Sequence, residues 1–226
     1  LTVLAFDLAE KYRCITIVMA DGSVGQMMEP AELPEMHPIR KMGQDWAVTG
    51  AAGRGTRILS SIYIDPVHEE VYNIHLANRW LEIKENEIRY REYYLDDADY
   101  VVIGFGTAGR VALSAVRAAR AEGIKIGLLR PISVSTYPYG VIEELAPNAP
   151  GILVVEMNTG QMLSDVQLAV KGRTPIEFYG RPGGMVPLPD AILEEIHRLV
   201  REPKNTGGDP VRRWLKRIND GVITLA

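Results

Sequence analysis

A pattern that repeats four times in the C-terminal half constrains this chain more than any other feature. Each repeat begins with a short apolar run, typical of a strand buried on both faces, and continues with a segment of helical periodicity. Four strand-then-helix units in succession predict a parallel sheet with right-handed crossovers. We expect this domain to span residues 96–201. The expected strands are 99–106, 125–131, 151–158 and 174–180, and the expected helices are 108–122, 139–146, 160–171 and 189–201.

The N-terminal segment has the pattern of the end of another domain. Residues 1–12 have helical spacing, and residues 14–20 form a continuous apolar run that predicts a buried strand. One helix and one strand cannot bury each other's faces, and the first residue is Leu rather than Met. We therefore expect residues 1–60 to be the tail of an α/β domain, with a candidate strand at 45–49, and the beginning of that domain to lie upstream.

Two further segments flank the repeating pattern. Residues 66–92 are predicted to form one long helix, because Asp65 can cap it and apolar residues recur every seven positions. This helix, within residues 61–95, is interpreted as a linker that crosses a domain surface or contacts another subunit. Residues 202–226 are a C-terminal extension. Their basic amphipathic segment, 212–218, is interpreted either as a frayed surface helix or as a docking element for a partner.

Composition argues against several classes of function. The net charge of −4 is not the basic balance of a nucleic-acid-binding protein. The sequence shows neither an apolar stretch of membrane-spanning length nor a signal-peptide pattern. The single cysteine, Cys14, cannot form an intrachain disulfide, which indicates a reducing, cytoplasmic compartment. The four histidines lack metal-ligand spacing and there is no CxxC pair, so no metal or iron–sulfur site is predicted in this chain.

A glycine-rich turn follows the first of the four strands. Residues 104–109 read GxGxxG between a predicted strand and a predicted helix, the context of a dinucleotide-binding loop. The second strand ends in Arg130 rather than in an acidic residue, so only an NADP site, with Arg130 on the 2′-phosphate, fits this pattern. The alternative is a tight strand–helix turn in which glycine is needed for packing, and we favour this second interpretation.

Polar residues follow several strands at one edge of the predicted sheet, which in open α/β sheets is the edge that holds ligands. Arg130 could bind an anion or a partner's carboxylate. Glu156 is costly to bury without a partner, and Asn158 is suited to cap the following helix. No catalytic residue is predicted, because no Ser/His/Asp set or carboxylate pair emerges. The candidates for lining a site or an interface are Asp21, Gly22, Gln26, Arg130, Glu156, Asn158 and Gln161.

Four segments of the sequence together carry a family resemblance. They are LAFDLAEKYRCITIVMADGSVGQMMEP, LLRPISVSTYP, ILVVEMNTGQMLSDVQLAVKG and FYGRPGGMVPLP, in this order. Across residues 1–200 the chain resembles the α subunit of 2-oxoacid:ferredoxin oxidoreductases. The resemblance implies the tail of a thiamine pyrimidine-binding α/β domain, followed by a parallel-sheet domain like the C-terminal domain of transketolase.

The resemblance also implies an activity. Members of this family decarboxylate a 2-oxoacid on thiamine diphosphate with Mg²⁺, pass electrons through iron–sulfur clusters to ferredoxin, and deliver the acyl group to coenzyme A. The expected partners are a β subunit that binds thiamine diphosphate and γ and δ subunits. The cofactors are expected on those subunits or on the upstream part of the α subunit, and the isolated chain is expected to be inactive. The substrate is expected to be 2-oxoisovalerate or 2-oxoglutarate. A non-catalytic interaction module remains an alternative.

Overall fold

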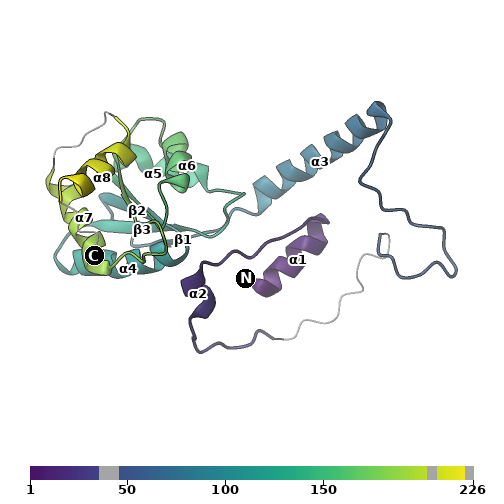
Figure 1. Ribbon diagram of the computed structural model, residues 1–226, viewed down its shortest axis with the longest axis horizontal. Helices are drawn as coiled ribbons and strands as arrows, with labels where there is room; N and C mark the ends of the chain where they lie inside the picture. The colour runs from purple at the N-terminus through teal and green to yellow at the C-terminus, as the bar shows by residue number, and fades with distance from the viewer. Residues whose placement is uncertain (36–45, 203–207, 222–226) are drawn as a thin grey trace. The chain divides into compact units, whose positions relative to one another are not determined.

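The computed structural model describes residues 1–35, 46–202 and 208–221. The chain divides into two units, Leu1–Asn86 and Glu87–Ala226, which are described separately here as unit 1 and unit 2 (Figure 1). Unit 2 contains the repeating strand–helix pattern. Within the described ranges, no helix is long and apolar enough to cross a membrane.

Unit 2 is built on a five-stranded sheet with the order β1-β3-β2-β4-β5. The four predicted strands are present and parallel to one another. The sequence pattern did not predict a fifth strand, β1, which pairs antiparallel with β3 at the edge of the sheet. The result is the α/β fold with a mostly parallel sheet that the sequence predicts. The strands are β1 Tyr90–Tyr93, β2 Tyr100–Gly104, β3 Ile126–Pro131, β4 Ile152–Glu156 and β5 Ile176–Gly180.

Helices cover both faces of the sheet. Helix α4 packs against α7, and α5 packs against α6. With right-handed crossovers and this strand order, the two pairs lie on opposite faces. A last helix, α8, contacts β5. The helices are α4 Gly106–Ala121, α5 Tyr139–Leu145, α6 Gln161–Val170, α7 Pro189–Arg201 and α8 Pro210–Asn219, with a 3₁₀ turn, η1, at Ala146–Asn148.

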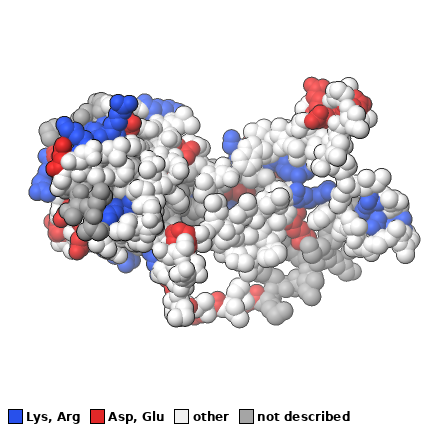
Figure 2. Space-filling view, in the orientation of Figure 1, with Lys and Arg blue, Asp and Glu red and all other residues white. Residues whose placement is uncertain are grey.

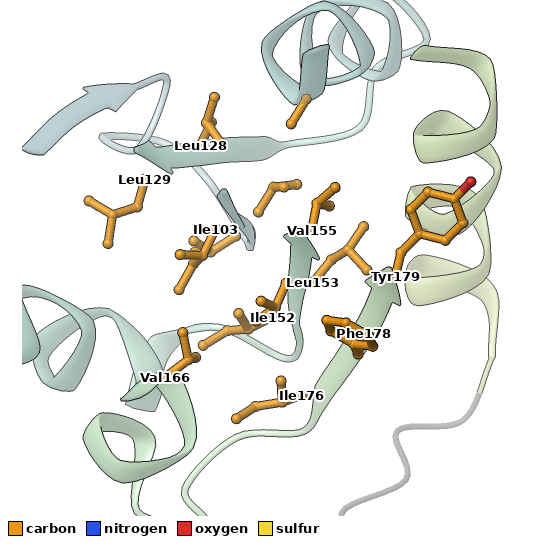
Figure 3. Close-up of a cluster of buried hydrophobic side chains, with 14 of the residues drawn as sticks. Ile103, Leu128, Leu129, Ile152, Leu153, Val155, Val166, Ile176, Phe178 and Tyr179 are labelled. Atoms are coloured by element: carbon orange, nitrogen blue, oxygen red, sulfur yellow. The ribbon is translucent and has the colours of Figure 1, made fainter. Parts of the chain in front are cut away.

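The core of unit 2 lies around the central strands (Figure 3). Every residue of β4 and of β5 is buried, as expected for strands that helices cover on both sides. Alanines at helical spacing bring α4 close to the sheet. The buried apolar side chains include Ile103, Leu128, Leu129, Ile152, Leu153, Val155, Val166, Ile176, Phe178 and Tyr179.

Unit 1 differs from the prediction for residues 14–20. Helix α1, Thr2–Tyr12, is present, but residues 15–20 have no regular secondary structure, and Ile17 is 74% exposed. A strand is stable only when a neighbouring strand satisfies its backbone groups, and the described part of unit 1 contains no strand at all. The candidate strand at 45–49 is likewise absent over 46–49, and residue 45 lies outside the described residues.

The long helix is shorter than predicted. Helix α3 spans Pro66–Asn86 and stops before residues 90–93, which form β1. Pairing with β3 gives these residues interstrand hydrogen bonds, and this tertiary contact overrides the helical periodicity. The apolar stripe on α3 is exposed: Val67, Ile74 and Leu81 are each more than half accessible to solvent.

Candidate functional site at the carboxyl edge of the sheet

The carboxyl ends of the four parallel strands lie at one edge of the sheet. Strands β2 and β4 are neighbours there, and the helices that follow them, α4 and α6, lie on opposite faces. This is the point at which the strand order reverses. In open α/β sheets, ligands bind in the crevice at such a point, so the turns after β2 and β4 define the candidate site.

Glu156 is the most deeply buried charged residue at this edge. Its carboxylate is fully buried and accepts two backbone hydrogen bonds, from Met162 N to Oε2 and from Leu163 N to Oε1, each 2.9 Å. Burial raises the pKa of Glu156, and these hydrogen bonds oppose that rise. The side chain therefore satisfies the first turn of α6, and the geometry gives a structural reason for a buried carboxyl at this position.

Asn158 completes the same turn. Its Oδ1 accepts hydrogen bonds from Gly160 N at 2.7 Å and Gln161 N at 3.2 Å, so Asn158 stabilises the turn that leads into α6. The sequence predicts that Asn158 caps this helix, but the N-cap residue is Gly160, and the first-turn amides bond to Glu156 instead. Gly160 has a φ of 106°, a conformation that favours glycine. Gln161 opens α6. The structure thus brings Glu156, Asn158 and Gln161 together in the hydrogen-bonded turn between β4 and α6.

Two tyrosines and an aspartate, to which the sequence analysis gives no role, lie beside this turn. The Tyr139 hydroxyl donates to Asp165 Oδ1 on α6, and the rings of Tyr137 and Tyr139 meet edge to face at 5.2 Å. The Tyr137 hydroxyl is buried and has no hydrogen-bond partner among the described residues. Burial, followed by the charges of Asp165 and Glu156, raises the pKa of Tyr137. Tyr137 is therefore a neutral donor that points to no described acceptor.

The glycine-rich turn after β2 is explained by packing. A Cβ on Gly109 would lie 2.3 Å from the carbonyl oxygen of Gly104, so α4 approaches β2 more closely than any larger residue allows. Gly106 has a φ of 53°. Arg130 Nη2 donates to Gly106 O at 3.1 Å, so the guanidinium bonds to the turn itself. These contacts support the packing interpretation of residues 104–109 over a phosphate loop.

The loop after β3 is anchored from the start of unit 2. Ser133 Oγ accepts from Arg89 N at 2.8 Å and donates to Thr136 O at 2.8 Å. Thr136 Oγ1 donates to Glu87 O at 2.6 Å, and Arg89 pairs with the Glu87 carboxylate at 2.6 Å. The loop therefore has a fixed backbone, which presents Tyr137 and Tyr139 to α6.

The remaining three candidates belong to unit 1. Gly22 and Gln26 are the first and last residues of α2, Gly22–Gln26. Asp21 caps this short helix, because its carboxylate accepts from Val24 N at 2.9 Å. The structure therefore assigns Asp21 a capping role within unit 1.

The residues that the structure describes do not fit a metal–diphosphate or iron–sulfur site. No group of three or more His, Cys, Asp or Glu side chains in the described ranges is arranged to hold a metal ion. A cluster with four cysteine ligands would need more than the one cysteine in the sequence.

Comparison with known proteins identifies the class to which this sheet belongs. Residues 98–192, which hold the four parallel strands and their carboxyl-edge turns, match the family model of pyruvate:ferredoxin oxidoreductase core domain II. Over most of its length the chain is similar to subunits of 2-oxoacid:ferredoxin oxidoreductases. The family resemblance noted in the sequence is thereby confirmed.

Two relatives and one solved structure illustrate the match. Ketoisovalerate oxidoreductase subunit VorB of Methanothermobacter thermautotrophicus is 41% identical over 201 residues, which cover 88% of this chain and 56% of that protein. The 2-oxoglutarate synthase subunit KorA of Methanothermobacter marburgensis is 31% identical over 221 residues, which cover 86% of this chain and 59% of that protein. This chain therefore spans little more than half the length of these curated relatives.

The solved structure shares the fold. The 2-oxoglutarate:ferredoxin oxidoreductase of Magnetococcus marinus, determined with 2-oxoglutarate, coenzyme A and succinyl-CoA bound, matches with a TM-score of 0.51. The match covers 62% of this chain and 24% of that one, at 19% identity. At this level of identity the likeness supports the fold and nothing further.

Proposed function

We propose that this chain is the C-terminal part of the α subunit of a thiamine-diphosphate-dependent 2-oxoacid:ferredoxin oxidoreductase. The complete enzyme would oxidise a 2-oxoacid to its acyl-CoA and pass the electrons to ferredoxin. The observation that carries the proposal is the 41% identity to a ketoisovalerate oxidoreductase subunit across 88% of this chain. The core domain II match over residues 98–192 supports it independently.

The proposed domain organisation follows the sequence. Residues 1–60 are assigned to the end of the pyrimidine-binding domain, 61–95 to the linker, 96–201 to the transketolase C-terminal-like domain and 202–226 to the extension. The division of the structure between Asn86 and Glu87 falls within the assigned linker, at the end of α3.

We propose that the cofactors are held elsewhere in the complete enzyme. Thiamine diphosphate with Mg²⁺ and the iron–sulfur clusters require donor sets that the described residues do not supply. The contribution of this chain is then structural: it supplies walls and subunit contacts around a reaction centre formed by the β, γ and δ subunits and the upstream α domain. A cytoplasmic location accompanies this assignment.

The carboxyl edge is the proposed contact surface of unit 2. Glu156 and Asn158 fix the turn before α6, and Arg130 fixes the turn before α4. Gln161 lies at the same edge, as does the Tyr137 hydroxyl, which has no hydrogen-bond partner in the described part of the chain. For unit 1, the α2 turn with Asp21, Gly22 and Gln26 is proposed as a second lining or contact segment.

The relatives favour a branched-chain 2-oxoacid as the substrate. Two ketoisovalerate oxidoreductase subunits are 41% and 40% identical to this chain, whereas four 2-oxoglutarate synthase subunits range from 31% to 25%. We therefore expect the complete enzyme to prefer 2-oxoisovalerate to 2-oxoglutarate.

Co-expression with the partner subunits tests this proposal. The α subunit that contains this sequence should copurify with β, γ and δ subunits. The complex should reduce a ferredoxin-like dye with 2-oxoisovalerate and coenzyme A, and the chain alone should not. Activity of the isolated chain would refute the proposed division of labour. Micromolar binding of NADPH to the chain, followed by fluorescence, would instead favour the dinucleotide-binding alternative.

A further inference from the structure

Among the described residues, β5 is the last strand of the sheet, and one of its edges is paired with no other strand. On its inner side, Ile152 N donates to Pro175 O at 2.9 Å and Arg181 N donates to Glu156 O at 3.0 Å. Successive backbone groups of a strand point to opposite sides, so the even-numbered residues of β5 turn their carbonyl groups outward. Such an unpaired row of backbone groups is a template for a strand from another chain.

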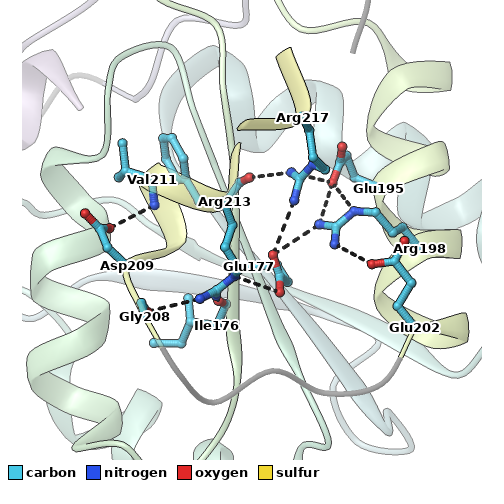
Figure 4. A network of polar contacts seen from close by, with 11 residues as sticks. Ile176, Glu177, Glu195, Arg198, Glu202, Gly208, Asp209, Val211, Arg213 and Arg217 are labelled. Carbon is cyan, nitrogen blue, oxygen red and sulfur yellow. Dashed lines mark hydrogen bonds and ion pairs between the residues drawn. The ribbon is translucent and has the colours of Figure 1, made fainter. Parts of the chain in front are cut away.

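Helix α8 supplies donors to these outward carbonyls (Figure 4). Arg213 Nη2 donates to Ile176 O at 2.6 Å, and Arg217 Nη2 donates to Phe178 O at 3.1 Å. The arginines are four residues apart, and so lie on one side of the helix about 6 Å apart along its axis. The two carbonyls are two residues apart on the strand, about 6.6 Å. This match lets a helix satisfy acceptors that otherwise need a strand.

A buried ionic network holds both guanidinium groups in place. The Glu177 carboxylate lies 3.4 Å from Arg213 Nε and 3.4 Å from Arg217 Nη1. Glu195, on α7, lies 3.1 Å from Arg217 Nη2 and 2.8 Å from Arg198 Nη2. Charges that are removed from water must be paired. Removing one member of the network would therefore leave an unpaired buried charge, which destabilises the fold. The network therefore fixes α8 to both β5 and α7.

An aromatic contact adds to the packing of α8 on β5. Trp214 is 3% exposed, and its ring meets that of Phe178 edge-on with centroids 5.3 Å apart. The opposite side of α8 faces solvent: the Arg212 side chain is 88% exposed. Figure 2 shows Lys and Arg side chains grouped over the end of unit 2 where α7 and α8 lie. The side of α8 that carries Arg213 and Arg217 thus contacts β5, and the opposite side faces solvent.

We infer that α8 is a strap that closes the free edge of β5, and that the strap must be released before β5 can pair with the same strand of a second copy of this chain. Arg213 and Arg217 occupy the acceptors that an incoming strand would use. Helix α8 lies outside the core domain II match, and its closure of the β5 edge does not depend on the proposed enzyme activity.

Amide hydrogen exchange and sedimentation of the full chain test the strap. The N–H groups of Ile176 and Phe178 point to the same outer side as their carbonyls, so α8 protects them by excluding water rather than by accepting their hydrogens. The double variant Arg213→Ala/Arg217→Ala should admit water there and increase exchange at Ile176 and Phe178 by at least about tenfold. It should also shift the chain to a larger species as its concentration rises. The control Arg212→Ala, on the solvent face of the same helix, should change neither quantity. Amides of β4, which lie inside the sheet, serve as the internal reference.

The single variant Arg217→Ala is the second arm of the experiment. It keeps Arg213 and Trp214, so exchange should rise more at Phe178 than at Ile176, a split that a general loss of stability does not produce. If exchange of the β4 amides also rises in the double variant, that variant has unfolded. The exchange pattern of the single variant then tests the strap. Equal exchange at both positions in the single variant overturns the strap. The strap is also overturned if exchange at β5 rises in the double variant while its sedimentation matches that of the unsubstituted chain.

Discussion

Similar apolar runs form a buried strand in unit 2 and an exposed irregular segment in unit 1. In unit 2, the run that forms β4 is completely buried between two neighbouring strands. In unit 1, residues 15–20 are similarly apolar, yet they form no strand and leave Ile15, Ile17 and Met19 exposed. Their composition is alike, so the difference lies in the neighbours. An apolar run becomes a strand when other strands take up its hydrogen bonds and helices cover its faces.

The largest expected effect comes from removing a buried side chain. Leu153→Ala in β4 should lower the free energy of unfolding of unit 2 by about 2–5 kcal/mol, because it removes apolar contacts and leaves a cavity. Ile17→Ala in unit 1 should change stability by no more than about 0.5 kcal/mol, since its side chain is already exposed. Urea unfolding of the two variants measures the contrast. Equal losses would mean that residues 15–20 are buried in the chain in solution.

Glycines sharpen the same comparison. Gly109→Ala forces α4 away from β2, because the new Cβ would lie 2.3 Å from Gly104 O; we expect a loss of about 1–3 kcal/mol. Gly25→Ala, in α2 of unit 1, meets nothing within 4 Å and should leave stability nearly unchanged. Thermal unfolding followed by circular dichroism distinguishes them. A neutral Gly109→Ala would contradict the packing explanation of the glycine-rich turn.

The smallest expected effect concerns the buried carboxyl of Glu156. Its pKa is raised in the fold, so above the ordinary value of about 4.3 the folded chain binds more protons than the unfolded chain. This residue's contribution to stability therefore falls as pH rises through the window above about 4.3 and levels off beyond the raised pKa.

Glu156→Gln removes this titration and one of the two acceptors for α6, at a cost of about 1–2 kcal/mol. The stability of the native chain minus that of the variant should be larger near the acidic end of the window than at neutral pH. Asp97 and Glu143, whose pKa values are lowered by Arg120 and Lys171, titrate in both proteins and cancel in the difference. A difference that does not vary with pH would contradict the raised pKa.

The candidate site shows how far local sequence patterns reach. The local pattern predicts that Asn158 takes part in the turn before α6, and its side chain does accept hydrogen bonds from Gly160 N and Gln161 N. The N-cap position itself belongs to Gly160, and the next amides bond to Glu156. The role of Glu156 required the return of α6 over the strand end. Tyr139 and Asp165 meet only because α5 and α6 pack together, and no spacing in the sequence indicates that contact.

The sequence by itself determined the four parallel strands and their helices, because the burial of each strand is written in its own apolar residues. It also showed the resemblance to 2-oxoacid:ferredoxin oxidoreductase α subunits, through four segments that occur in the same order. Only the tertiary structure decided where α3 gives way to β1, why residues 15–20 are not a strand, and that α8 covers β5. Each of these outcomes depends on a partner distant in the sequence, and the free energy of that contact exceeds the local preference of the segment.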